Sequence, residues 1–521
     1  MTTTDSVCIE LLPLGTTLVV ERGTELQDVL FAHGVEFPCG GRGRCKGCRV
    51  RVLAGSLPTT PEDQRLLAET ELVAGWRLAC RAQASQNLKL ELAQWEAAIL
   101  DDNTVFAFTP QEGLGIAVDL GTTTIVAQLL DLQTGHVLGV RTGLNVQAQH
   151  GADIMSRVEF ALAKREPSKL TQLIRTQIGG LMGELLKASG RSASELEKVV
   201  IVGNTAMHHL FCGIDIEPLS HYPFEPVNDG LQVFSKEELG WSWAAQASRS
   251  ASGGGLPAAR PAAKVHFLPC LGGFVGSDIL AGILATKLHE SEELAGLVDL
   301  GTNGEIVIGN RERLLCASTA AGPAFEGARI SMGMRAATGA ISEVILRDGQ
   351  FLCHVLGHVP PRGICGSGLV DAVACLLETG RLHPTGRLIE GQSVELCPPV
   401  VLSQADVREL QLAKGAIAAG IRLLLQQWGA SLDQLTRIHL AGAFGNYISR
   451  ASAQRIGLLP FGPDKVVPAG NTALLGAKLA LFSLQAGNAS YPDLLGKIQH
   501  VSLSADPAFQ EIFADEMLFP G

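Results

Sequence analysis

Aromatic residues and long apolar runs are scarce in this sequence. Phenylalanine, tyrosine and tryptophan make up 5% of the 521 residues, whereas glycine alone contributes 59. That balance favours α/β folds with tight glycine turns over β-sandwiches. No apolar run reaches the roughly 18 residues of a transmembrane helix. The first residues, MTTTDSVCIELLPL, lack the cationic start and apolar core of a signal peptide. We therefore expect no membrane partner and a cytoplasmic location.

Positive charge is also in short supply. The 41 lysines and arginines face 52 acidic residues, which leaves a net charge of -11. A chain this acidic binds nucleic acid poorly unless one face is strongly basic, so we expect no nucleic-acid partner. At 521 residues the chain exceeds one ordinary core, and about two to four domains are expected.

A disulfide framework is not expected, because cytoplasmic thiols stay reduced. Of the 12 cysteines, eight are scattered singly and fit small buried hydrophobes. The other four are patterned. Cys39, Cys45 and Cys48 fall within CGGRGRCKGC, and Cys80 follows after 31 further residues.

Two metal centres suit such a set of thiolates. A four-cysteine zinc site usually takes two C-x2-C pairs, and only one is present here. A 2Fe-2S cluster takes three cysteines from one loop and a fourth from a distant strand. The loop resembles that of the adrenodoxin and putidaredoxin type of ferredoxin, in which five residues separate the first two ligands. Its glycines let backbone N–H groups turn towards sulfur, so we favour a 2Fe-2S cluster over zinc.

The segments around this loop alternate as the strands of a small sheet do. TTLVVERGTELQDVLFAHGVEFP indicates a strand, a cap at Thr24, a short helix and a turn. CRVRVLAG, WRLACRAQ and LKLEL indicate later strands. This order matches the β-grasp fold of these ferredoxins, which we expect over residues 1–93.

The cysteine loop is also basic, and no acid lies between Phe37 and Pro61. Its charges either compensate an anionic cluster as a solvated surface or form a docking face for an acidic partner. The basic residues are Arg42, Arg44, Lys46, Arg49 and Arg51.

Two stretches lack any clear periodicity. QWEAAILDDNTVFAFTPQE indicates a linker over residues 94–112. AAQASRSASGGGLPAARPAAK (244–264) is rich in alanine, serine, glycine and proline, which predicts a flexible surface insertion.

One phrase occurs twice after the linker. V-D-L-G-T appears in GIAVDLGTTTIVAQLLD and, 180 residues later, in AGLVDLGTNGEIVIGN. Two copies between matching strands indicate duplicated lobes, which we expect over residues 113–296 and 297–521. Such hairpins offer glycine and threonine N–H groups and hydroxyls to a phosphate chain. Asp119 and Asp299 stand where an acid can position Mg²⁺ or a water. The Walker A sequence of P-loop NTPases is absent.

Three further segments complete a series. KVVIVGNTAMHHLF and RIHLAGAFGNYIS each combine a strand, a glycine and a helix start, and GNTALLGAKLALF predicts a small-residue helix. In order, the series resembles the phosphate 1, connect 1, phosphate 2, adenosine and connect 2 motifs of the ASKHA superfamily. That superfamily includes acetate and sugar kinases, heat-shock chaperones and actin. The matching residues are 117–127, 199–210, 297–308, 438–446 and 470–482.

By this resemblance, Asp119 and Asp299 are the catalytic acids that handle magnesium and water. The residues expected around the phosphates and the adenosine are Gly121, Thr122, Thr123, Thr124, Gly301, Thr302, Asn303, Gly304, Gly442, Ala443, Phe444 and Gly445. AAGPAFEG (320–327) and ICGSGL (364–369) are either structural turns or ligand contacts. His208 and His209 fit packed or capping residues better than ligands.

A 2Fe-2S ferredoxin domain followed by a two-lobed ASKHA ATPase domain resembles one family over nearly the whole chain, the ATP-dependent reductive activators of corrinoid proteins. The resemblance implies a 2Fe-2S cluster, ATP and Mg²⁺, and a one-electron reaction that returns Co(II) to Co(I). It implies a corrinoid protein as acceptor, a low-potential electron donor and a homodimer. The linker of about 19 residues leaves no room for a small extra domain that some relatives carry there.

Three other interpretations stay open. An activator of a radical dehydratase is also ASKHA-based, but carries a 4Fe-4S cluster whose ligands lie in the ATPase fold. A redox sensor would use the cluster only to report, and a metabolite kinase would carry the ferredoxin as an appendage. The rate of ATP turnover with and without an oxidised corrinoid protein separates these alternatives.

Overall fold

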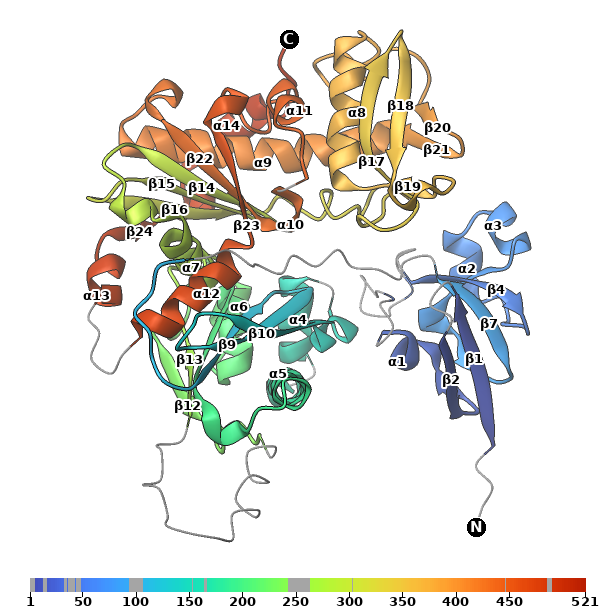
Figure 1. The fold of residues 1–521 in the computed structure, drawn as a ribbon. Helices are drawn as coiled ribbons and strands as arrows, with labels where there is room; N and C mark the ends of the chain where they lie inside the picture. The colour runs from blue at the N-terminus through green and yellow to red at the C-terminus, as the bar shows by residue number, and fades with distance from the viewer. Residues whose placement is uncertain are drawn as a thin grey trace. The chain divides into compact units, whose positions relative to one another are not determined.

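The computed structural model describes residues 5–12, 16–31, 35, 43, 48–92, 106–151, 153–163, 166–241, 263–301, 303–445, 447–484 and 490–521. The chain forms two compact units (Figure 1). One contains Met1–Ala98 and Leu144–Glu166, and the other contains Ile99–Gly143 and Pro167–Gly521. Among the described helices, none is long and apolar enough to cross a bilayer.

The first unit is built on a five-stranded sheet in the order β2-β1-β7-β4-β5. Its elements are β1 (Ser6–Leu12), β2 (Thr16–Glu21), β3 (Thr24–Glu25), α1 (Leu26–Phe31), β4 (Arg49–Ala54), α2 (Pro61–Leu66), α3 (Glu69–Val73), β5 (Trp76–Leu78), η1 (Ala79–Arg81), β6 (Gln83–Ala84) and β7 (Leu88–Leu92). β1 and β7 are parallel, and the other neighbours are antiparallel. Alternate residues of β1 and β7 are buried in one core with Leu26 and Leu30 of α1. This arrangement confirms the predicted β-grasp fold.

The first unit also takes in a segment from much later in the chain. η2 (Val146–Gln149) and α4 (Ile154–Ala163) belong to it. Leu144, Val146 and Ala148 pack against the core of the ferredoxin sheet. The domain boundaries expected from the linear sequence, after residues 93, 112 and 296, stay predictions.

The second unit contains two six-stranded sheets, of which the first has the order β10-β9-β8-β11-β13-β12. Its elements are β8 (Leu114–Leu120), β9 (Thr124–Asp131), β10 (Val137–Leu144), α5 (Pro167–Ala188), β11 (Leu196–Gly203), α6 (Thr205–Cys212), β12 (Gln232–Ser235), β13 (Lys264–Phe267) and α7 (Ser277–Thr286). β8, β11 and β13 are parallel, and β8 is antiparallel to β9. The predicted insertion at 244–264 lies almost wholly outside the described residues.

The second sheet has the order β23-β22-β14-β15-β16-β24. Its elements are β14 (Ala295–Leu300), β15 (Gly304–Gly309), β16 (Leu314–Thr319), α9 (Gln404–Trp428), β22 (Arg437–Ala441), α10 (Gly442–Gly445), α11 (Arg450–Arg455), β23 (Val466–Gly470), α12 (Thr472–Ser483), α13 (Ser490–Leu495), β24 (Ile498–His500) and α14 (Pro507–Glu516). A smaller α/β part consists of β17 (Ala340–Arg347), β18 (Gln350–Val355), β19 (Gly363–Ile364), α8 (Gly366–Glu378), β20 (Ser393–Cys397) and β21 (Val400–Ser403). α9 covers β15 and β16, and α12 returns to the first sheet, where it packs on α7, β8 and β11.

The two large sheets repeat one pattern. β8 is antiparallel to β9 and parallel to β11, just as β14 is antiparallel to β15 and parallel to β22. β10 and β16 lie beyond the hairpins, and β13 and β23 lie beyond the parallel strands. This correspondence agrees with the duplication that the repeated V-D-L-G-T phrase predicts.

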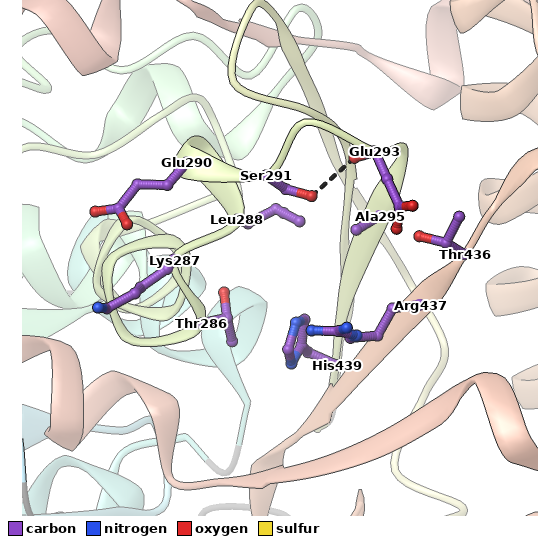
Figure 2. Close-up of a pocket in the computed structure, with 10 residues that line it drawn as sticks. All are labelled: Thr286, Lys287, Leu288, Glu290, Ser291, Glu293, Ala295, Thr436, Arg437 and His439. Carbon is purple, nitrogen blue, oxygen red and sulfur yellow. Dashed lines mark hydrogen bonds between the residues drawn. The ribbon is translucent and has the colours of Figure 1, made fainter.

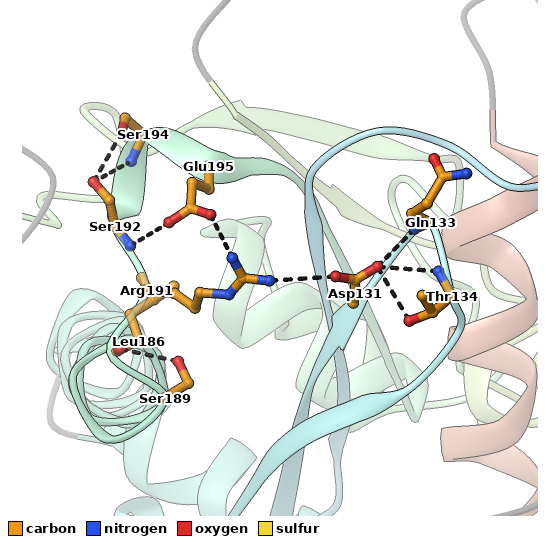
Figure 3. Close-up of polar contacts among 9 residues, drawn as sticks. All are labelled: Asp131, Gln133, Thr134, Leu186, Ser189, Arg191, Ser192, Ser194 and Glu195. Atoms are coloured by element: carbon orange, nitrogen blue, oxygen red, sulfur yellow. Dashed lines mark hydrogen bonds and ion pairs between the residues drawn. The ribbon is translucent and has the colours of Figure 1, made fainter.

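Ion pairs hold the turn between β9 and β10 (Figure 3). The Arg191 guanidinium lies 3.3 Å from the Asp131 carboxylate at the end of β9 and 3.0 Å from Glu195. Asp131 also accepts hydrogen bonds from the amides of Gln133 and Thr134. Because these groups are about one-third exposed, the network orders the turn more than it stabilises the fold.

The second half of the expected linker is packed. Phe106 and Phe108 lie against Phe482 of α12, with ring centroids 5.5 and 4.5 Å away. The Gln111 side-chain amide donates to the Phe482 carbonyl (2.7 Å). Residues 106–111 are therefore tied to the second unit before β8 begins.

Candidate functional site

Two tight hairpins carry the repeated aspartates. In the first, Asp119 lies opposite Val126, and the Gly121 amide donates to the Thr124 carbonyl (3.0 Å). In the second, Asp299 lies opposite Glu305, and the turn is closed by the Gly301 amide. That amide donates to the Asn303 carbonyl (3.0 Å), so the second turn is one residue shorter than the first.

Two asparagines that sequence reasoning missed point at the first hairpin. Asn204 caps α6, and its Nδ2 donates to the Thr122 hydroxyl (2.8 Å). Asn471 caps α12, and its Nδ2 donates to Asp119 Oδ2 (2.9 Å). The two stand in the same phrase, G-N-T-A, at 203–206 and 470–473. That repeat was a visible signal, because asparagine at a helix start caps with its oxygen and leaves its amide nitrogen free to donate elsewhere.

Four carboxylates share this region, and two of them, Asp278 and Glu305, were not anticipated. Loss of water contact raises the pKa of Asp119 to about 6, and the Asn471 hydrogen bond partly offsets the rise. The same desolvation, together with the Asp119 charge, raises the pKa of Asp299 to about 7. The pKa of Asp278, at the start of α7, is also raised to about 7 by desolvation and then by Asp299 and Asp119.

Glu305 joins this group from β15. Desolvation, then the charges of Asp278 and Asp299, raise its pKa well above the ordinary value, although the Ser318 hydroxyl donates to it (3.4 Å). Desolvation raises the pKa of all four carboxylates, and charges within the group raise the pKa of Asp278, Asp299 and Glu305 further, so the site favours bound positive charge.

Such a site fits Mg²⁺ bound together with phosphate. Within the described ranges, no three acidic, histidine or cysteine side chains converge closely enough to hold an ion by themselves. Mg²⁺ keeps several waters and is usually bound through one or two carboxylates plus substrate phosphates. The spread of Asp119, Asp278, Asp299 and Glu305 over two hairpins and a helix start suits that mode better than an all-protein cage.

Three turns that the sequence analysis singled out converge in the second lobe. Phe325, from 320–327, stacks on Phe444 of α10, with centroids 4.7 Å apart and planes at 20°. A Cβ on Gly366, from 364–369, would lie 2.9 Å from the Phe444 ring and 2.0 Å from the Phe325 carbonyl oxygen. The close packing explains why glycine occupies position 366, and it places the predicted adenosine segment against both candidate turns.

Gly442 brings this segment to the acids. Its φ is +86°, and a Cβ there would lie 2.6 Å from Asp299 Oδ1. Gly445 packs against Leu440, and Ala443 lies between these glycines in α10. The predicted adenosine segment therefore begins beside the second aspartate.

Other predicted site residues have different surroundings. Thr124 begins β9 and closes the first turn, with Thr123 inside that turn. Gly304 is buried in β15, where a Cβ would meet Ile417 of α9 and Thr319. Thr302 lies outside the described residues. The role of each in nucleotide binding stays a prediction.

Two of the four predicted cluster ligands can be placed, while Cys39 and Cys45 lie outside the described residues. Cys48 precedes β4 and Cys80 lies in η1, and both are buried in the ferredoxin core. The Ala79 amide donates to the Cys48 carbonyl (3.0 Å), which fixes the two cysteine segments side by side. The segments of one predicted loop ligand and of the predicted distant ligand thus lie side by side, as a 2Fe-2S site requires, and the ligand roles stay predictions.

The described members of the basic loop are paired. Arg49 binds Glu71 (2.7 Å), and Arg51 lies 3.6 Å from Glu91. The other three, Arg42, Arg44 and Lys46, lie outside the described residues. The docking role of this loop stays a prediction.

His208 and His209 are fully buried in α6. His208 packs edge-on against Phe267 and its Nε2 meets the Gly230 carbonyl, while His209 Nδ1 meets the Thr205 carbonyl. Burial lowers the pKa of His208 to about 4. Both are packed residues, as predicted.

A separate cavity of about 300 Å³ opens at the other end of the second sheet (Figure 2). It is lined by Ala295 and Arg437, where β14 and β22 begin, and by Lys287 at the end of α7. Since Asp299 lies near the opposite end of β14, this cavity is distinct from the region of the four acids.

Comparison with family models matches the chain in three consecutive parts. Residues 9–85 match the 2Fe-2S iron-sulfur cluster binding domain, 114–291 the RACo middle region, and 293–521 the C-terminal domain of RACo, the ASKHA domain. The corrinoid activation enzyme RamQ of Eubacterium limosum is 34% identical over 458 residues, or 81% of this chain and 74% of RamQ. The chain belongs to the ATP-dependent reductive activators of corrinoid proteins.

Other relatives agree with this assignment. The [Co(II) methylated amine-specific corrinoid protein] reductase of Methanosarcina barkeri is 27% identical over 395 residues, which cover 70% of this chain and 69% of that protein. A solved structure, the reductive activator for corrinoid,iron-sulfur protein, superposes with a TM-score of 0.66 at 27% identity. That match covers 99% of this chain and 98% of the other. The predictions of a 2Fe-2S ferredoxin domain and an ASKHA domain are confirmed.

Proposed function

We propose that this protein reduces the Co(II) form of a corrinoid protein to Co(I), with one electron that passes through a 2Fe-2S cluster and with ATP bound at the four acids. The proposal rests on four desolvated carboxylates at the two matching hairpins and at the start of α7, in one chain with a ferredoxin domain. Cys39, Cys45, Cys48 and Cys80 would hold the cluster.

The chain's own groups suit a Mg²⁺-nucleotide. Asn204 orients the Thr122 hydroxyl, and Asn471 orients the Asp119 carboxylate. The starts of α6, α7 and α12 supply backbone N–H groups and partial positive charge for phosphate oxygens. Phosphoryl transfer needs positioning and charge neutralisation more than covalent help. Asp119 and Asp299 would therefore act on Mg²⁺ or on the attacking water.

Energetics explain why nucleotide is needed. When bound, a plant-type 2Fe-2S cluster carries one electron at roughly −400 mV. An electron moved uphill by 100 mV costs about 2.3 kcal/mol. ATP does not push the electron. ATP can favour a closed arrangement of the two lobes. If the corrinoid protein binds the closed form more tightly, ATP would promote the complex in which the electron is transferred.

The test uses anaerobically purified protein and a purified Co(II) corrinoid methyl-carrier protein. We expect Co(I) absorption to grow with dithionite and Mg-ATP together, and not with dithionite or ATP alone. A homodimer and a low-potential protein donor complete the proposal, to be checked by solution mass measurement and by replacing dithionite with reduced ferredoxin. ATP turnover that ignores the corrinoid protein, with no Co(I) formed, would refute the proposed function.

A further inference from the structure

One segment of the nucleotide-binding half of the chain folds with the ferredoxin domain. Residues 144–166 belong to the first compact unit, although they are flanked on both sides by residues of the second. Leu144, Val146 and Ala148 pack against the ferredoxin core, and η2 contacts α1. The chain thus passes between the two units three times, after residues 98, 143 and 166.

Buried polar groups brace this segment internally. Asn145, Gln147 and Arg157 have no exposed surface. Asn145 Oδ1 accepts from the Gln147 amide (3.0 Å), and Arg157 donates to the Gly151 carbonyl (2.9 Å) and to Gln147 Oε1 (3.3 Å). Buried polar side chains persist only where such partners hold them, so the segment is a defined piece of structure.

Both ends of the segment connect to elements that contact β9, in the first six-stranded sheet. It begins at the end of β10, which neighbours β9, and it leads into α5, which packs on β9. β9 is the second strand of the hairpin that carries Asp119. A displacement of that hairpin by nucleotide would therefore act on both ends.

The other face of the contact leads to the cluster ligands. α1 contacts η2 on one side and η1 on the other, and η1 contains Cys80. β9 therefore pairs with β10, the chain continues from β10 directly into η2, and η2 contacts α1, which contacts η1.

We propose that residues 144–163 form a coupling arm that links the ATP-binding hairpin to the cluster domain, with Leu144 and Val146 as positioning residues for the electron-transfer step. This inference rests on the proposed function. A domain joined to its neighbour by three chain segments rotates less freely than one joined by a single flexible linker. Nucleotide binding could therefore change the position of the cluster domain during electron transfer.

The test compares three full-length variants. Val146→Asp places a charge in the contact with the ferredoxin core and should detach the arm. Val146→Ile keeps the contact. Met155→Asp is the matched control, because Met155 lies on α4 and is 46% exposed. Where Val146→Asp fails to retain iron, Val146→Ala, which only trims the contact, takes its place.

Two readouts separate coupling from a general structural role. The first is hydrogen exchange at residues 26–31 with and without a non-hydrolysable ATP analogue and Mg²⁺. We expect a nucleotide-dependent change in the wild type, Val146→Ile and Met155→Asp, and none in Val146→Asp. The second is rate. We expect Val146→Asp to keep its cluster spectrum and its ATP turnover without partner, while ATP-dependent Co(II) reduction falls about tenfold, in the upper range of coupling changes.

The outcomes distinguish the arm from the proposed function. A nucleotide response at 26–31 that survives Val146→Asp overturns the coupling arm, as does Co(II) reduction within about twofold of the wild type. Equal loss of ATP turnover and Co(II) reduction overturns it too, because the defect would then lie in the nucleotide site. A wild type that binds nucleotide but never reduces Co(II) refutes the proposed function instead.

Discussion

Asn471 offers the sharpest test of the nucleotide site, because one side chain has two separable roles. Its Oδ1 accepts from the Leu474 amide (2.8 Å) and caps α12, while its Nδ2 donates to Asp119 Oδ2 (2.9 Å). Serine caps a helix about as well as asparagine. Asn471→Ser therefore keeps the cap and removes the donor to Asp119.

The magnitude follows from that one hydrogen bond. A hydrogen bond to a charged group contributes roughly 1.5–3 kcal/mol, and one pKa unit corresponds to about 1.36 kcal/mol. We take the lower end of this range, about 1.5 kcal/mol, for a single hydrogen bond. The bond stabilises the charged carboxylate, hence its loss should raise the pKa of Asp119 by about one unit.

The assay is the pH dependence of kcat/KM for ATP, which reports ionisations of the free enzyme. If ionised Asp119 is required, kcat/KM rises with pH through the pKa of Asp119. In Asn471→Ser that rise should move to higher pH by about one unit. The coupled acids titrate as a group, so the shift between variants is the quantity to compare.

Asn204→Ser is the matched control. It keeps the cap of α6, where Asn204 Oδ1 accepts from the Met207 amide (3.0 Å), and removes the donor to the neutral Thr122 hydroxyl. Asn204→Ser should slow turnover without changing the pH at which kcat/KM for ATP rises. The assigned role of the Asn471–Asp119 contact would be refuted if the pH of this rise did not shift in Asn471→Ser, or if it shifted equally in both variants.

Three further outcomes are expected. Cys48→Ser or Cys80→Ser should lose the visible cluster spectrum and the iron while Mg-ATP still binds by calorimetry. Zinc, or about four irons per wild-type chain, would contradict a 2Fe-2S site. Asp299→Asn should keep the cluster and weakened nucleotide binding but lose ATP turnover and Co(II) reduction together. Reduction that survived without hydrolysis would mean that binding alone suffices. Because the folded-state pKa values of Asp278 and Asp299 are raised to about 7, their ionisation costs stability as pH rises through 7. Ligand-free protein should melt at a higher temperature near pH 6.5 than near pH 8. The gap should shrink in Asp299→Asn, and an identical gap in both proteins would count against the coupled acids.

The repeated phrases carried most of what the sequence could predict. V-D-L-G-T predicted two hairpins with an aspartate at equal positions, and the strand registers agree. The cysteine spacing predicted the ferredoxin domain, because ligand geometry constrains the local chain strongly. Glycines such as Gly442 and Gly366 stand where a Cβ would collide with a neighbour, which is why those turns could be recognised in sequence.

What escaped prediction depends on tertiary packing. Asp278 is one acid among 52, and only the turn from β13 into α7 brings it to the hairpins. Glu305 faces Asp299 across a turn whose shortness the sequence did not reveal. Residues 144–163 carry no recognisable signature, and their place in the ferredoxin unit follows from three apolar contacts. Local patterns predict elements, whereas the partners of their exposed faces are set by the whole fold.

The two hairpins give their aspartates different surroundings. Asp119 receives the Asn471 amide, which favours its charged form. Asp299 lies beside Gly442 instead, and desolvation followed by the Asp119 charge disfavours its ionisation. Two carboxylates with environments that differ in this way can divide their work. We propose that Asp119 would serve as the standing anion for hydrated Mg²⁺ and that Asp299 would accept a proton from the attacking water. Duplication supplies the symmetric frame, and the single residue removed from the second turn, with the donor added at the first, breaks that symmetry.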